Sequence, residues 1–270
     1  MAKLPLDPGV MERMVVDIAA ASLKNARDLL TSAQAVLDAQ QWPRSFSFAA
    51  LALEEVGKAS LCMTMLAMPP AVREEFRPDF EKKFISHQAK AEFAHMVLGM
   101  VDEKVPASVQ QMMDDAIAAA RRTNAVKFRG LYVDYTDTGD LLQPDTVGES
   151  DARLMVTTVT TALAASRFTE SAVADPDVFL DFLHQWQNAV DFDALGTHIA
   201  ATPEGELLTQ LRTAAQEDAL SPSMFQGTAF ADLVAAADTV VLTPAGQDPQ
   251  TSMEHDGTPL EGRPSDTVAP

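Results

Sequence analysis

Two short stretches of the sequence place charged and titratable side chains inside apolar surroundings. The stretch ALALEEVGKASL contains Glu54, Glu55 and Lys58, and the stretch FISHQAK contains His87 and Lys90. Burial of such charges is unfavourable unless they are paired or used. A histidine beside a buried carboxylate can change its protonation near neutral pH. We therefore take these five residues as the candidate site.

Helical spacing relates these residues to one another. Glu54 and Lys58 lie one helical turn apart, so we expect them to form an ion pair. His87 falls on the apolar stripe of the following helix, at spacings of three and four residues. That stripe consists of Phe80, Phe84, His87, Ala91, Ala94, Leu98 and Val101. The structural alternative is an ordinary helix ion pair and a packed core histidine.

The composition is that of a helical globular protein. The 270 residues are 47% hydrophobic and 22% charged, with only 12 glycines. Alanine, leucine, methionine and glutamine recur between prolines, which favours helix. Cys62 is the single cysteine and lies in an apolar helix, so we interpret it as a core residue and not as a nucleophile.

These patterns predict an all-α fold. Helices are expected over residues 10–39, 43–67, 78–104, 106–128, 149–175 and 177–190, with weaker helices over 203–219 and 228–240. Residues 130–145 are predicted to form a loop or short hairpin, because glycine, proline and alternating apolar residues gather there. The organisation that follows is a helical domain over 1–190, a helical extension over 191–242 and a disordered tail over 243–270.

The helix expected over 43–67 is apolar nearly all round, and this predicts that it is buried. Pro43 suits its first turn. Gly57 lies on one of its apolar faces, where the missing side chain would let another backbone come close. One four-helix core would leave part of this helix uncovered, so we expect a homodimer formed through the helices over 43–67 and 78–104.

Charge is distributed unevenly along the chain. The net charge is −19, and residues 137–270 hold 4 lysines and arginines against 22 acidic residues. Such a balance argues against non-specific nucleic-acid binding over the whole surface, although the first half could supply a local basic site. It also motivates a second hypothesis, a non-catalytic helical interaction protein whose acidic half binds a basic partner.

A basic cluster of four residues ends the helix expected over 106–128. Its members are Arg121, Arg122, Lys127 and Arg129. Cations stabilise a helix C-terminus, and this is the interpretation that we favour. The functional alternative is a contact to an RNA backbone beside the candidate site.

Three features predict a cytoplasmic protein. No stretch approaches the roughly 20 apolar residues of a membrane span. The N-terminal sequence MAKLPLDPGV lacks the apolar core of a signal peptide. A lone cysteine cannot form an internal disulfide.

The two charged stretches together resemble the AbiV family of bacterial abortive-infection proteins, within the HEPN superfamily. That family has an E-E-x-G-K element on one helix and an F-x-S-H-x-x-K element on the next. The matching residues are Glu54, Glu55, Gly57, Lys58, Phe84, Ser86, His87 and Lys90. The segment FRGLYVDYTDTGDLLQP resembles the family's segment after the fourth helix, and the whole resemblance covers about residues 15–170.

The resemblance implies an antiparallel helical bundle that forms a homodimer and acts in phage defence. It implies a phage-encoded protein or RNA as partner, and neither cofactor nor metal. The lack of a membrane span, noted above, predicts no membrane partner. Many HEPN proteins are metal-independent ribonucleases with an arginine four to six residues before a histidine. In this chain a lysine stands five residues before two of the histidines, Lys82 before His87 and Lys90 before His95. The ammonium group of lysine lacks the planar geometry with which the guanidinium group of arginine donates paired hydrogen bonds.

The resemblance also implies a role for each candidate residue. In a ribonuclease, His87 would be the acid or base in attack by a 2′-hydroxyl on the adjacent phosphate. Lys58 and Lys90 would bind the phosphate, and Glu54 and Glu55 would orient the lysines or adjust His87. The alternatives are a toxin that blocks translation and a polar network that only holds the dimer in register.

A di-iron bundle is a further alternative, because such proteins use Glu-x-x-His pairs on two helices. Glu92 and His95 have this spacing, and Asp181 and His184 repeat it with an aspartate. Glu92 points away from the apolar stripe, which argues against this alternative.

Overall fold

The structure, a computed structural model, describes residues 3–101, 108–132 and 144–189, with scattered positions between 134 and 142 and between 192 and 209. The described part confirms the all-α fold class. Its helices are α1 Pro8–Asp38, α2 Trp42–Ala67, α3 Pro70–Ile85, α4 His87–Val101, α5 Val109–Leu131, α6 Glu149–Ala165, α7 Arg167–Ala174 and α8 Pro176–Ala189. The predicted hairpin is a two-stranded antiparallel ribbon of β1 Asp134–Tyr135 and β2 Leu141–Leu142, followed by a 3-10 turn, Pro144–Thr146.

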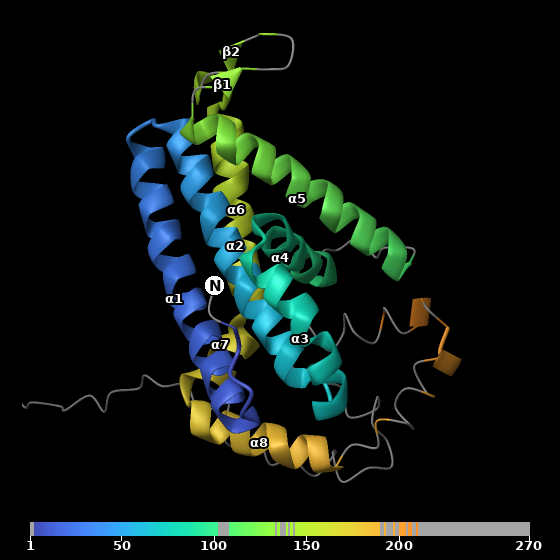
Figure 1. The fold of residues 1–270 in the computed structure, drawn as a ribbon. Helices are drawn as coiled ribbons and strands as arrows, with labels where there is room; N and C mark the ends of the chain where they lie inside the picture. The colour runs from blue at the N-terminus through green and yellow to red at the C-terminus, as the bar shows by residue number, and fades with distance from the viewer. Residues whose placement is uncertain are drawn as a thin grey trace, which may run out of the picture.

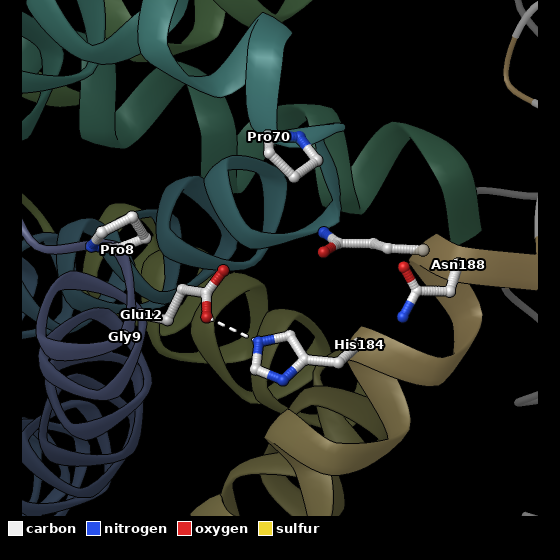
Figure 2. A pocket seen from close by; sticks show the side chains of 7 residues that line it. Pro8, Gly9, Glu12, Pro70, His184 and Asn188 are labelled. Carbon is white, nitrogen blue, oxygen red and sulfur yellow. Dashed lines mark hydrogen bonds and ion pairs between the residues drawn. The ribbon is translucent and has the colours of Figure 1, made fainter.

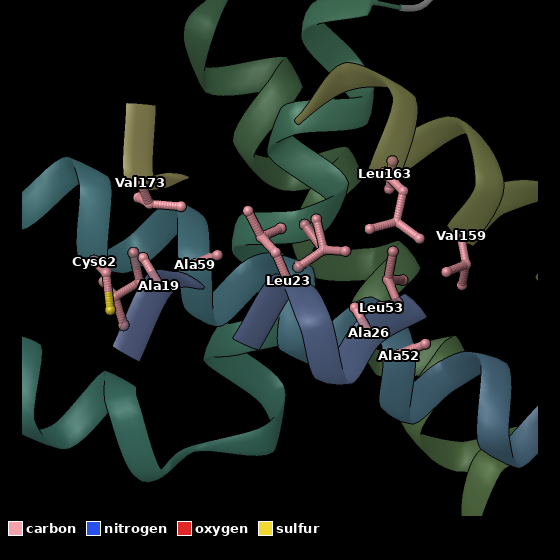
Figure 3. Packing of buried hydrophobic residues seen from close by; sticks show 14 of the residues in the cluster. Ala19, Leu23, Ala26, Ala52, Leu53, Ala59, Cys62, Val159, Leu163 and Val173 are labelled. Carbon is pink, nitrogen blue, oxygen red and sulfur yellow. The ribbon is translucent and has the colours of Figure 1, made fainter. Parts of the chain in front are cut away.

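The central element is α2, which packs against α1, α4, α5 and α6 (Figure 1). Small residues allow these helices to approach one another, because alanine contributes little bulk. Figure 3 shows Ala26 of α1 near Leu53 of α2, with Leu163 of α6 beyond them. Most of α2 is buried in this core, as predicted.

The homodimer was expected because α2 would be left partly uncovered. The structure removes that reason, because helices of the same chain cover α2 on several sides. Whether two chains pair remains a prediction.

The prediction of one helix over 78–104 is wrong, because two helices, α3 and α4, occupy this region. Pro69 has an extended backbone and separates α2 from α3, which begins at Pro70. The second break is at Ser86, whose ψ of 115° is not helical and whose Oγ accepts a hydrogen bond from the N–H of Ala89. This bond caps α4, so the serine hydroxyl favours a new helix over continuation of the old one. The helix predicted over 149–175 is also divided, at Ser166, whose ψ is 11° and whose side chain does not cap α7.

Gly57 is the point at which α2 and α4 come closest. A Cβ atom on Gly57 would lie 1.7 Å from the carbonyl oxygen of Lys90, which is backbone and cannot swing away. The predicted close approach of another helix at this glycine is therefore confirmed, and the contacting residue belongs to the candidate site.

Several expectations fall on other parts of the chain. The helical extension over 191–242 lies almost wholly outside the described residues, and the tail over 243–270 lies entirely outside them. Among the helices that the structure describes, none is long and apolar enough to cross a membrane.

The contact at Gly57 gives a first prediction. Gly57→Ala should lower the free energy of unfolding by up to about 2 kcal/mol, since an overpacking cost of up to about 3 kcal/mol against α4 outweighs the roughly 1 kcal/mol of helix propensity that alanine gains. Urea denaturation followed by circular dichroism measures this change. Gly99→Ala is the matched control, because its Cβ would meet only the flexible Met112 side chain at 3.3 Å. Equal stability of the two variants would contradict the prediction.

Candidate functional site

The carboxylate of Glu54 lies at the centre of the site. It is buried in the middle of α2, with 3% of its side chain exposed. One oxygen, Oε1, accepts a hydrogen bond from Nζ of Lys127 on α5, and Oε2 lies 2.5 Å from Nδ1 of His87 on α4. Both oxygens are therefore paired, and one carboxylate connects three helices.

His87 combines a fixed ring with an open face. It is the first residue of α4, directly after the break at Ser86, and 56% of its side chain is exposed. The expectation that it lies on the apolar stripe of one continuous helix is wrong for this reason. Because Nδ1 faces the carboxylate, a neutral ring donates its proton there and keeps Nε2 as an acceptor. That arrangement suits a general base.

Lys127 is the partner that the sequence interpretation missed. Only 2% of its side chain is exposed, so it is part of the core and not of a surface cluster that compensates the helix dipole. Its Nζ also donates to Asn124 Oδ1 at 2.9 Å, and Asn124 donates to Gln88 Oε1 of α4 at 3.0 Å. A signal was present in the sequence. The buried face of the C-terminal part of α5 follows a spacing of four and three and consists of Ala116, Ala120, Thr123, Lys127 and Gly130.

Lys58 and Glu55 form a separate pair beside this network. Nζ of Lys58 lies 2.7 and 2.6 Å from the two carboxylate oxygens of Glu55, and it also lies 5.9 Å from the centre of the Phe84 ring. The predicted ion pair between Glu54 and Lys58 is wrong, because the buried Lys127 takes the place of Lys58.

Lys90 is the uncommitted cation of the site. It is 8% exposed and forms no ion pair with any residue in the described part of the chain. Burial lowers the pKa of its ammonium group, and the neighbouring carboxylate of Glu54 acts in the opposite direction. Its Nζ is not among the fully buried polar atoms that lack a partner, so the ammonium group keeps contact with solvent, and an incoming anion could pair with it.

The surroundings of His95 and Cys62 shift the pKa of each group away from neutral pH. Burial, together with the positive charge of Arg122, lowers the pKa of His95 to about 4, and its Nε2 lies 3.2 Å from Oγ1 of Thr123. Burial raises the pKa of Cys62 to about 12, which agrees with its interpretation as a core residue.

A second buried glutamate lies near the C-terminal end of α2. Glu12 of α1 accepts a hydrogen bond from Arg73 of α3 through Oε1, and its Oε2 lies 2.7 Å from Nε2 of His184 on α8. Figure 2 shows this histidine contact at the edge of a cavity of about 380 Å³. Arg73 also donates to the carbonyl oxygens of Leu66 and Met68, so it fixes the end of α2. These hydrogen bonds hold α1 and α3 to the end of α2, so we refer to Glu12 and Arg73 as a structural clamp.

The di-iron alternative finds no support in these contacts. Glu92 accepts a hydrogen bond from Gln88, whereas His95 contacts Thr123 and His184 contacts Glu12. Among the described residues, no three histidine, cysteine or acidic side chains form a group that could hold a metal.

Removal of Lys127 gives a second prediction. Lys127→Met keeps the length of the side chain but leaves the buried Glu54 without its cation, so the free energy of unfolding should fall by about 3–5 kcal/mol. Lys58→Met is the control, because its pair with Glu55 is less deeply buried, with 19% and 16% of the two side chains exposed, and its loss should cost less than the loss of Lys127. Chemical denaturation of both variants measures the difference, and a larger loss for Lys58→Met would contradict the assignment of Glu54's partner.

The lowered pKa of His95 gives a third prediction. Between its ordinary value of 6.5 and about 4, the unfolded chain binds a proton that the folded chain does not. Stability should therefore fall as the pH falls through this range, by up to about 3 kcal/mol from this residue. Urea denaturation from pH 7 to pH 4 should show a smaller decrease for His95→Gln than for the wild type. Equal decreases would show that His95 does not carry this effect.

Comparison with known proteins identifies the family. A profile of the AbiV family of HEPN domains matches residues 14–164, which is more than half of the chain. The matched segment runs from α1 to the last turn of α6 and includes the helices that carry Glu54, His87 and Lys127. No curated protein and no solved structure gave a match. The chain therefore belongs to the AbiV family of HEPN proteins.

Proposed function

We propose that this AbiV-family protein is an anti-phage endoribonuclease that works without a metal ion, with His87 as its general base. The observation that carries the proposal is the contact between Nδ1 of His87 and the buried carboxylate of Glu54. This contact fixes the tautomer and leaves Nε2 on the exposed side chain, where a substrate can reach it.

The reaction follows from these groups. Nε2 of His87 takes the proton of a ribose 2′-hydroxyl, and the 2′ oxygen attacks the adjacent phosphorus. The bond from phosphorus to the 5′ oxygen breaks, and that oxygen takes a proton from water. The products are a 2′,3′-cyclic phosphate and a 5′-hydroxyl end. Glu54 stabilises the imidazolium that forms, as a buried carboxylate does in a catalytic triad.

Two lysines would stabilise the phosphate. Lys90 is buried and uncommitted, so it can pair with a phosphoryl oxygen without first breaking an ion pair. Lys58 is partly exposed and shares its charge with Glu55. These lysines would supply positive charge at the phosphate in a chain that lacks the arginine of the usual HEPN signature.

The proposal includes the state in which the protein acts. We take a homodimer as the active form and a phage-encoded protein as the trigger, as the family implies. RNA is the substrate, and growth arrest of the infected cell follows from its cleavage.

His87→Gln gives a fourth prediction. The variant should lose cleavage of total bacterial RNA by about 100-fold or more in buffer with EDTA, because general base catalysis contributes roughly that factor. Gel electrophoresis of the RNA and mapping of the cyclic phosphate ends measure the loss. Lys90→Ala should also reduce cleavage, and its melting temperature should stay near that of the wild type.

The structure offers a matched control for this variant. His184 is also about half exposed and also contacts a buried glutamate, but it lies in the clamp formed by Glu12 and Arg73. His184→Gln should keep full cleavage. Wild-type protein that arrests growth and leaves all RNA intact would refute the ribonuclease and favour a toxin that acts by binding.

A further inference from the structure

Two aromatic residues, Phe128 and Tyr132, lie at the C-terminal end of α5, the end that leads to β1 (Figure 1). Phe128 is 49% exposed, and Tyr132, which caps the helix, is 59% exposed. Their ring centres lie 6.4 Å apart and the ring planes differ by 26°, so the two rings face nearly the same way. Large exposed aromatic side chains of this kind commonly mark an interaction surface.

Arginines accompany these rings. At about 100° per residue, Arg121, Phe128 and Tyr132 fall within one narrow stripe of α5, and Arg122 and Arg129 lie beside it. No acidic residue occurs between positions 116 and 131, although the whole chain has a net charge of −19. The positive charge is therefore local and coincides with the aromatic rings.

A cavity of about 290 Å³ adjoins the same end of α5. Leu131 and Gly130 line it from α5, and Arg44 and Gln41 line it from the start of α2. Arg44 donates one hydrogen bond to Gln41 at 2.6 Å. The remaining donors of its guanidinium group make this cavity suitable for an anionic group next to the rings.

The aromatic rings also connect to the catalytic network proposed above. Nζ of Lys127 lies 4.7 Å from the centre of the Phe128 ring, and the same ammonium group pairs with Glu54. One ammonium group thus links the Phe128 ring to the carboxylate that holds His87.

We propose that this surface binds single-stranded RNA, with bases stacked on Phe128 and Tyr132 and phosphates held by Arg121, Arg129 and Arg44. The inference rests on the proposed function and adds the class of substrate. Arginine interleaved with exposed aromatic rings is the arrangement that binds single strands without reading their sequence. The bases of a duplex are already stacked on one another, so double-stranded RNA cannot use the rings.

Fluorescence anisotropy with a 12-nucleotide oligouridine tests the proposal. All its 2′ oxygens carry methyl groups, so the strand cannot be cleaved and binding is measured alone. Phe128→Ala and Tyr132→Ala in the full chain should each raise Kd by at least about 5-fold, since one stacked base contributes roughly 1–3 kcal/mol. Phe128→Tyr should bind like the wild type, and a duplex of the same length should bind more weakly.

Leu154→Ala is the matched control, because Leu154 is an exposed apolar side chain of α6. It should leave Kd unchanged. Wild-type binding by Phe128→Ala, or equal affinity for the duplex, would overturn the inference. A wild-type dimer that becomes monomeric on Phe128→Ala would also overturn it and would make the surface a subunit interface.

The two proposals can fail separately. His87→Gln should bind the methylated strand like the wild type, because His87 is proposed to act on the 2′-hydroxyl. If wild-type protein binds this strand through Phe128 and cleaves no RNA, the binding surface stands and the ribonuclease is refuted. If RNA is cleaved and Phe128→Ala has no effect on Kd, the surface is refuted and the ribonuclease stands.

Discussion

The buried carboxylate of Glu54 on the central helix ties α2 to both α4 and α5. The carboxylate of Glu54 would be strongly destabilising in the core of α2 without partners. Lys127 from α5 and His87 from α4 supply them, and each does so from a helix that packs directly on α2. Gly57 and Gly130 let these two helices approach closely enough, because a Cβ at either position would collide with a neighbour. The packing and the polar contacts therefore favour the same arrangement of α2, α4 and α5.

Two buried glutamates, Glu12 and Glu54, have similar surroundings but different roles. Each pairs with a buried cation and a half-exposed histidine. Around Glu12 the cation is Arg73, which also bonds to backbone carbonyls at the end of α2. Around Glu54 the neighbouring Lys90 is buried and has no ion pair within the described residues. This uncommitted charge distinguishes a site that can receive an anion from a clamp that holds helices together.

Local signals in the sequence predicted most of the helices but few of the contacts. Pro43 and the hydrophobic periodicity gave the bounds of α2 to within one residue, and Gly57 indicated the close approach of α4. The break at Ser86 was missed, since the apolar stripe continues across it and only the serine hydroxyl favours a new start. Pairing within one helix suggested Lys58 as the partner of Glu54, whereas the actual partner is 73 residues away in sequence. Such distant contacts depend on how helices pack, which a single sequence does not reveal.

Glu54 pairs with both Lys127 and His87, and this has a consequence for how sequences in this family can diverge. A lineage that replaced Lys127 by an apolar residue would leave a charge in the core, and selection would then favour a neutral residue at position 54. That second change would release the His87 ring, although neither substitution touches the histidine itself. Positions 54, 87 and 127 should therefore covary as a triplet among homologues. Loss of the lysine should mark branches in which the histidine has drifted as well.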